Sequence, residues 1–207
     1  MTRTSVIDSR PPNARAKLLD AALDVIRAQG YSATSVDDLC AAAGVTKGAF
    51  FHHFASKEAL AVAAADHWST RTAALFAAAP YHHLAQPLDR VLGYIDFRAA
   101  FVTGPVEGFT CLVGTMVQEA FATSPAIREA CDACISAHAR KLEADIAAAM
   151  AQYGVKGFTA ASLALHTQAV LQGAFILAKA RGGPAVALES VAHLKRYFIL
   201  LFQPSPV

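Results

Sequence analysis

The sequence predicts an all-α fold, because helix signals recur along its length and no strand signal interrupts them. Apolar residues repeat at intervals of three and four, with Ser, Thr or Pro before the repeats and Gly after them. We find no alternating apolar run and no Asn-Gly hairpin. The 207 residues suffice for one large or two small domains, and 55% apolar residues exclude a disordered chain.

Two helices are expected in the first 44 residues. The first covers Asn13–Gln29, where apolar residues keep helical spacing, and Gly30 ends it. A cap at Thr34 or Ser35 begins the second helix, which ends at Gly44, a residue suited to a positive φ.

Two further helices follow after very short turns. Thr46 can cap a helix over Lys47–Phe54, and Ser56 can cap a longer one that runs through Phe76 until Pro80. Five more helices complete the chain and bring the total to about nine: Pro87 to about Val102, Phe109–Phe121, Ser124 to about Gly154, Thr159–Arg181 and Ala185–Phe202.

The segment Gly157–Ala178 is long enough to span a bilayer and contains no Asp, Glu, Lys or Arg. Its six polar side chains, among them His166, Gln168 and Gln172, argue against a membrane span. The first 12 residues lack the apolar core of a signal peptide. We therefore expect a soluble, cytoplasmic protein without a membrane partner, whose apolar surplus belongs to a core, a ligand cavity or a subunit interface.

The charge of the chain is small, at +2, but its N-terminus is locally basic. Arg3, Arg10, Arg15 and Lys17 against Asp8 give the first 17 residues a charge of +3. Such an arm can lie along a phosphate backbone, and it can equally be an ordinary solvated tail.

Residues 34–54 combine two short helices with a tight turn at Gly44. This is the pattern of a helix-turn-helix, whose second helix can enter the major groove of DNA. Ordinary all-α folds also contain such connections, so the geometry alone leaves both interpretations open.

The residues of this segment point to one family more specifically than its helix pattern does. TSVDDL at 34–39, AAAGVTKGAFFHHF at 41–54 and SKEAL at 56–60 closely resemble the tetracycline-repressor (TetR) family of bacterial transcriptional regulators. A weaker likeness extends to CLVG at 111–114, QE at 118–119 and LQGA at 171–174.

The resemblance implies a homodimeric repressor without a cofactor. Residues 1–56 would form the DNA-binding domain with its basic arm, and residues 57–207 the ligand-binding and dimerisation domain. The protein would bind a palindromic double-stranded DNA operator and leave it when a small-molecule effector binds. The helices at about 159–181 and 185–202 would pair with their copies, and small residues such as Ala169 and Gly173 would allow close approach.

Candidate DNA contacts follow from the matching positions. Thr46 can offer its hydroxyl and helix N-terminus to a phosphate, Lys47 a mobile cation, and Ala49 a methyl for thymine. Where the family commonly has a tyrosine that meets a phosphate, this chain has Phe51. We expect an apolar contact to a sugar or methyl group there with somewhat weaker binding, or another group that takes over the phosphate contact. The full candidate set is Thr34, Thr46, Lys47, Gly48, Ala49, Phe51, His52, His53 and Lys57.

Candidate effector contacts lie on helices that surround the ligand cavity in the family. Their composition predicts an apolar cavity with few polar anchors and no fixed charge, so the effector would be hydrophobic or aromatic and not strongly anionic. Any one of them can also be plain core. The candidates are Trp68, Phe76, Tyr94, Phe97, Phe101, Cys111, Met116, Gln118, His138 and His166.

Two alternative functions stay open from the sequence. Cys111 would make the regulator a sensor of electrophiles or oxidants, provided that its thiol is accessible and its pKa is low. An all-α enzyme is the remote third reading, because the chain shows no nucleophile elbow, phosphate loop or zinc-protease motif. The pair Cys131 and Cys134 has the spacing of a metal or redox site but lacks further ligands nearby, so we expect it to fill the core.

Overall fold

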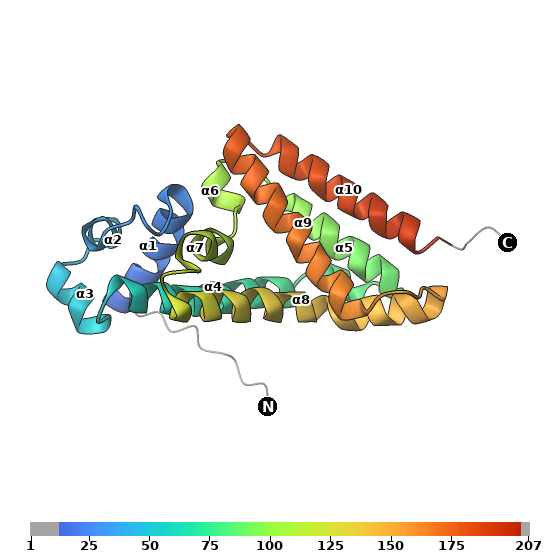
Figure 1. Cartoon of the computed structure of the whole chain (residues 1–207), viewed down its shortest axis with the longest axis horizontal. Coiled ribbons are helices and arrows are strands. Elements are labelled where there is room, and N and C mark those ends of the chain that lie inside the picture. Colours follow the sequence, from blue (N-terminus) through green and yellow to red (C-terminus); the bar gives the residue numbers. More distant parts are fainter. Residues whose placement is uncertain (1–12, 204–207) are drawn as a thin grey trace, which may run out of the picture.

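The computed structural model describes residues 13–203 (Figure 1). These residues form helices and connecting turns without any strand, which confirms the all-α prediction for this part of the chain. The basic arm at Arg3 and Arg10 lies outside the described residues. The elements are α1 (Ala14–Gln29), α2 (Val36–Ala43), α3 (Lys47–His53), α4 (Lys57–Ala77), the 3₁₀ turn η1 (Pro80–His83), α5 (Pro87–Ala100), α6 (Val106–Phe109), α7 (Leu112–Ala120), α8 (Pro125–Tyr153), α9 (Ala160–Arg181) and α10 (Ala185–Leu201).

Side-chain caps fix where the N-terminal helices begin. Ser35, rather than Thr34, caps α2, and it forms a reciprocal capping box with Asp38. Thr46 caps α3 by accepting the N–H of Ala49, and Ser56 caps α4 in the same way. The predicted boundaries of these helices are therefore correct to within a residue or two.

The segment expected as one helix over Phe109–Phe121 is divided instead. Phe109 ends α6, and α7 begins at Leu112 after extended backbone at Thr110 and Cys111. In a continuous helix, positions 109 and 112 would share one face. Phe109 packs into one hydrophobic core and Leu112 into another, so the break lets each side chain enter its own core.

Two hydrophobic cores organise the molecule. The first joins α1, α2 and α3 to α7 and to the N-terminal parts of α4 and α8, around Leu18, Phe50 and Met116. The second joins α5, α9 and α10 to the C-terminal part of α8 and the end of α4, around Tyr94 and Phe198. The long helices α4 and α8 lie side by side and connect the two ends of the molecule (Figure 1). The expected domain boundary at 56/57 stays a prediction.

Helix α9 has the length and apolar composition that would let it cross a membrane, yet 39% of its most apolar window is buried within this chain. It packs against α8 and α10. Its polar side chains are used internally, since Thr167 donates to the Leu163 carbonyl at 2.9 Å and Gln168 donates to the Tyr94 hydroxyl at 3.1 Å. These contacts account for the buried side of the uncharged stretch.

Candidate functional sites

The helix-turn-helix is built around a left-handed turn. Gly44 ends α2 with φ of +63°, a conformation that costs a glycine little and other residues more. The turn brings α3 back against α1, where Phe50 is fully buried and Phe54 nearly so. Because these two side chains anchor one side of α3, the opposite side faces outward.

The outward side of α3 carries most of the predicted DNA contacts. Ala49 and His53 are half-buried, whereas Phe51 is 52% exposed. The Lys47 ammonium lies 2.9 Å from Asp37 Oδ1, but both side chains are largely exposed, so a phosphate can compete for the cation. We call this side the α3 surface, and its exposed members are Thr46, Lys47, Gly48, Phe51 and His52.

Two predicted DNA contacts, Thr34 and Lys57, lie outside α3 and make contacts within the chain. Thr34 is 1% exposed, and its hydroxyl donates to the Gly30 carbonyl at 2.6 Å. The Lys57 ammonium donates to the carbonyls of Tyr31 and Thr34 at 3.0 and 2.8 Å and sits 4.4 Å from the centre of the Tyr31 ring. Both side chains hold the loop between α1 and α2, because each is satisfied by backbone carbonyls that the sequence spacing does not reveal.

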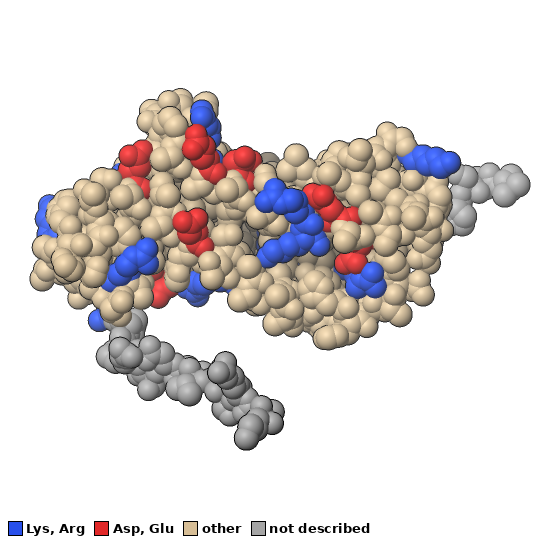
Figure 2. All heavy atoms as spheres, turned by 90° about the horizontal axis from the view of Figure 1, so that it is seen from below, with Lys and Arg blue, Asp and Glu red and all other residues tan. Residues whose placement is uncertain are grey.

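Charge around the α3 surface is modest. On the face shown in Figure 2, basic and acidic side chains are few and intermixed, and most of the surface carries neither. Arg15 and Lys17 on α1 are exposed near the same end of the molecule, and the Arg15 guanidinium lies 5.4 Å from the centre of the Phe54 ring. Attraction to a phosphate backbone in the described part would thus depend on a small number of cations.

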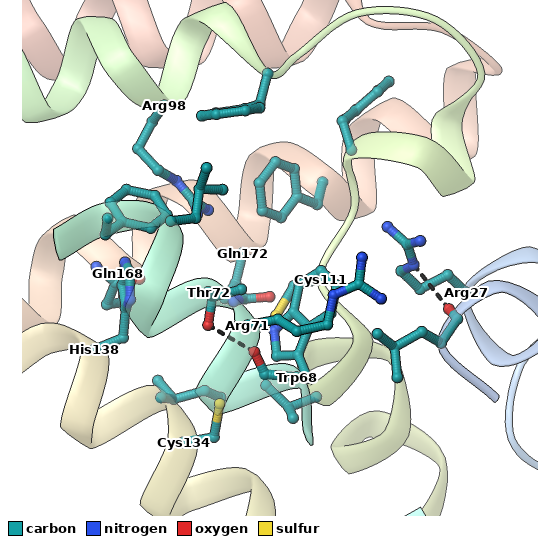
Figure 3. Close-up of a pocket in the computed structure, with 18 of the residues that line it drawn as sticks. Arg27, Trp68, Arg71, Thr72, Arg98, Cys111, Cys134, His138, Gln168 and Gln172 are labelled. Atoms are coloured by element: carbon teal, nitrogen blue, oxygen red, sulfur yellow. Dashed lines mark hydrogen bonds between the residues drawn. The ribbon is translucent and has the colours of Figure 1, made fainter. Parts of the chain in front are cut away.

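A cavity of about 470 Å³ lies where α1, α4, α5, α6, α8 and α9 meet (Figure 3). This volume is typical of small-molecule sites. Five of the predicted effector residues line it: Trp68, Phe76, Phe101, Cys111 and His138.

The other five predicted effector residues do not line this cavity. Tyr94 is 1% exposed and lies behind the wall, and Phe97 packs edge-on against Phe76 with 5.3 Å between ring centres. Met116 is buried in the first core, and Gln118 lines a small neighbouring pocket. His166 is exposed on α9 beside the Tyr197 ring. Helix-face reasoning placed these residues on the right helices but could not fix their rotation.

The expectation of a cavity without fixed charge is wrong. Arg27, Arg71 and Arg98 line the cavity together with Asp24. One of these arginines was detectable from sequence spacing, since Arg98 lies one turn before Phe101 on the same helix. The selection of aromatic residues overlooked it, because a charged residue in an apolar helix is ordinarily a solvated one.

Three buried polar side chains are linked by hydrogen bonds behind one wall of the cavity. Gln168 donates to the Tyr94 hydroxyl, and that hydroxyl lies 3.0 Å from His138 Nε2. Burial, reinforced by the charges of Arg98 and Lys141, lowers the pKa of His138 to about 3. His138 is therefore neutral at physiological pH, and because the Tyr94 proton is given to Nε2, the ring proton is assigned to Nδ1.

The four cysteines differ in their surroundings. Cys40, Cys131 and Cys134 are buried, and burial raises the pKa of Cys131 to about 12 and that of Cys134 to about 11. Cys111 is half-buried and borders both the cavity and the small pocket beside it. Among residues 13–203, no three His, Cys, Asp or Glu side chains gather where they could hold a metal ion.

Comparison with known proteins places this geometry in a family. The description "Bacterial regulatory proteins, tetR family" matches residues 18–64, and "Transcriptional regulator LmrA/YxaF-like, C-terminal domain" matches residues 87–193. The second match alone covers more than half of the chain.

Individual relatives agree with this assignment. The HTH-type transcriptional repressor Rv3405c of Mycobacterium tuberculosis is 35% identical over 94 residues, which cover 43% of this chain and 50% of that protein. The transcriptional regulator AcuR of Cereibacter sphaeroides is 33% identical over 108 residues, which cover 51% of this chain and 48% of that protein. The matches thus span only about half the length of these curated relatives.

The similarity in three dimensions is more extensive. A TetR transcriptional regulator from Chloroflexus aurantiacus superimposes with a TM-score of 0.77 at 25% identity, over 90% of this chain and 94% of that one. Such relatives regulate transcription and are not enzymes, so the enzyme alternative falls away. The helix-turn-helix, the second helical core and these matches together show that the chain belongs to the TetR family of bacterial transcriptional regulators.

Proposed function

We propose that the protein is a ligand-responsive repressor that binds a palindromic operator as a homodimer and leaves it when a small apolar or aromatic effector fills the cavity. One observation carries the proposal. Leu23, Asp24 and Arg27 of α1 form part of the cavity wall, and α1 is also the helix against which α3 packs. An occupant of the cavity would therefore touch the element that positions the α3 surface.

Arg27 is the most direct mechanical link. It is only 12% exposed, and it donates to the Leu23 and Gly108 carbonyls at 2.8 and 3.1 Å and pairs with Asp24. Its guanidinium also lies 5.2 Å from the centre of the Trp68 ring. One side chain thus joins α1 to α6 and to α4, and a ligand that displaces Trp68 or α6 would shift α1.

The proposed dimer surface consists of the outer sides of α9 and α10. Large apolar side chains that are 40–66% exposed lie there, and a Cβ at Gly173 would meet nothing within 4 Å among the described residues. Exposed apolar side chains gathered on neighbouring helices are typical of an obligate interface. Its exposed members are Leu165, Ile176, Leu177, Leu188, Tyr197, Ile199 and Leu200.

The DNA-binding part of the proposal rests on the α3 surface, with Lys47 as a phosphate contact. The test is fluorescence anisotropy with a duplex taken from upstream of the protein's own gene and a scrambled duplex of equal composition. Lys47→Ala should weaken binding to both about equally and lower the salt slope by about one. Lys156→Ala, which removes an exposed lysine outside α3, is the matched control. Equal affinity of the natural chain for both duplexes at every salt concentration would contradict the proposal.

A second candidate function is the sensing of electrophiles through Cys111, within the same cytoplasmic regulator. The observation that favours it is exposure at the cavity. Cys111 is half-buried there, whereas Cys134, which also lines the cavity, is buried, as are Cys40 and Cys131. Covalent modification there would place a substituent where the effector would otherwise bind. The test is whether an electrophile that modifies Cys111 also releases DNA, and whether Cys111→Ser abolishes the release.

A further inference from the structure

The cavity contains an arginine whose charge nothing in the described part of the chain neutralises. Arg98 lies in the last turn of α5 and is half-buried. Its guanidinium lies 5.4 Å from the centre of the Phe76 ring and 5.6 Å from that of Phe175. Both distances are within the range of cation–π contacts, which favour this position of the planar group at the cavity.

The other two arginines of the cavity are already occupied. Arg27 pairs with Asp24 at 2.8 Å and donates to two backbone carbonyls. Arg71 is 59% exposed and pairs with Asp20 at 2.9 Å. Within residues 13–203, Arg98 has no carboxylate within 4.0 Å and no hydrogen-bond acceptor, which leaves its N–H donors available to an occupant of the cavity.

The surroundings of Arg98 favour a negative charge further. His138 beside it is neutral, and the carboxylate among the described lining residues, Asp24, is held by Arg27. Figure 3 shows Arg98 reaching from α5 into the cavity above Gln168 and Gln172, with His138 on the same side. A neutral ligand that covered Arg98 would bury an unpaired cation, which is costly, whereas an acid would compensate it with charge-assisted hydrogen bonds.

The remaining walls of the cavity determine which kind of uncharged group the ligand can carry. Trp68, Phe101, Phe109, Val113 and Ile135 line the rest of the cavity with apolar surface. This surface suits an aromatic ring or an alkyl chain, and the space of about 470 Å³ holds a small organic molecule rather than a peptide or a nucleotide chain.

We propose that the effector is an apolar organic acid, aromatic or aliphatic, whose carboxylate pairs with Arg98 while its body lies among the aromatic residues of the cavity. This proposal rests on the proposed function, because it takes this cavity as the effector site. An acid replaces the hydrophobic or aromatic effector without strong negative charge that the sequence predicts.

The experiment compares acids with their uncharged amides, which have nearly the same size and shape. The probes are naphthalene-1-acetate, 3-phenylpropionate and octanoate with the three corresponding amides, titrated into the purified full-length protein by calorimetry. At least one acid should bind about tenfold or more tightly than its amide. If no acid exceeds its amide, including the case in which none of the six binds, the proposal is overturned.

Variants assign the preference to one side chain. Arg98→Gln and Arg98→Met, whose thioether fits between the same two rings, should reduce the acid-to-amide ratio to about one, while Arg98→Lys should keep part of it. Arg128→Gln removes an exposed arginine of α8 outside the cavity and should leave the ratio unchanged. Retention of the full ratio in both Arg98→Gln and Arg98→Met would overturn the assignment. Thermal denaturation without ligand verifies that each variant is folded.

The binding measurement contains no DNA, so its result is independent of the repressor proposal. A second readout joins the two. With the natural protein bound to its upstream duplex, the preferred acid should release the DNA, whereas Arg98→Gln should bind the duplex with equal affinity and not release it. Acid binding without DNA release would contradict the repressor proposal and leave the Arg98 site intact.

Discussion

The backbone N–H of Ser32 donates to Glu119 Oε2 at 2.6 Å, so a carboxylate of α7 holds the loop between α1 and α2. The other oxygen of Glu119 lies so close to Gly30 that a Cβ there would meet it at 2.5 Å. One turn earlier on the same side of α7, the Lys179 ammonium of α9 donates to Thr115 Oγ1 at 2.7 Å. The helix-turn-helix and the proposed dimer helix α9 are thereby connected through α7.

Glu119→Ala should loosen this connection. A hydrogen bond to a charged acceptor contributes about 1 to 3 kcal/mol, and because Glu119 is exposed we expect a loss of about 1 kcal/mol in the free energy of unfolding. Urea denaturation measures it. Glu129→Ala, which removes an exposed carboxylate of α8, should stay within about 0.5 kcal/mol of the natural chain. Equal effects of the two substitutions would show that the Ser32 contact contributes nothing.

If the outer sides of α9 and α10 form the proposed dimer surface, Leu177→Glu should yield monomers. Leu177 is 48% exposed on α9, and in a two-fold symmetric interface each substitution occurs twice and buries two uncompensated carboxylates. Light scattering after size exclusion at micromolar concentration measures the mass. Leu84→Glu changes a leucine of similar exposure outside α9 and α10 and should leave a dimer. A dimer that survives Leu177→Glu would argue against this face.

Acid should destabilise the protein through His138. Its pKa of about 3 in the folded chain lies below the ordinary value of 6.5, so under pH 6.5 the unfolded chain takes up a proton that the folded chain does not. The free energy of unfolding should therefore fall by up to about 2 kcal/mol from this group between pH 7 and pH 5.

Non-titrating variants isolate this contribution. His138→Gln should have a flatter stability profile between pH 7 and pH 5 than the natural chain, whereas His83→Gln, at an exposed histidine, should run parallel to it. Denaturation midpoints at four pH values suffice. Parallel profiles for His138→Gln and the natural chain would mean that His138 titrates normally in the folded state.

Cys111 should react with N-ethylmaleimide before the other cysteines. It is half-buried at the cavity, whereas burial keeps Cys131 and Cys134 protonated with pKa values of about 12 and 11. Peptide mass spectrometry of the folded protein should find Cys111 labelled first, and an apolar acid that occupies the cavity should slow the labelling. Simultaneous labelling of all four cysteines would instead indicate unfolding, and no labelling at Cys111 would reject the electrophile-sensing proposal.

Helix boundaries were predictable because they depend on local chemistry. Caps such as Thr46 and Ser56 and the left-handed Gly44 act within a few residues, and the structure places them where the sequence indicates. The break at Thr110 was not predictable, because it arises from two separate cores that compete for neighbouring side chains.

Exposed candidate residues were predictable only on the short helix α3, where assigning one face to the core identifies the opposite face. The α3 surface follows once Phe50 is assigned inward. The internal contacts of Thr34 and Lys57 were not predictable, because their partners are backbone carbonyls of a loop, which leave no trace in side-chain spacing. Arg98 was missed because its significance depends on Phe76 and Phe175, which lie 22 and 77 positions away in the sequence.

Phe51→Tyr should tighten operator binding. Phe51 is 52% exposed on α3, next to the buried Phe50 with 5.1 Å between ring centres, so a para hydroxyl would point outward without disturbing the core. At the matching position the family commonly has a tyrosine whose hydroxyl meets a phosphate. A new hydrogen bond to a charged phosphate should lower the Kd for the upstream duplex by about fivefold to tenfold for each subunit, and by about 25-fold to 100-fold for a dimer in which both subunits gain it. Phe121→Tyr, at a phenylalanine that is 59% exposed outside the helix-turn-helix, should leave the Kd unchanged. An unchanged Kd in Phe51→Tyr would place position 51 away from the phosphate backbone and direct attention to Thr46 and His52 instead.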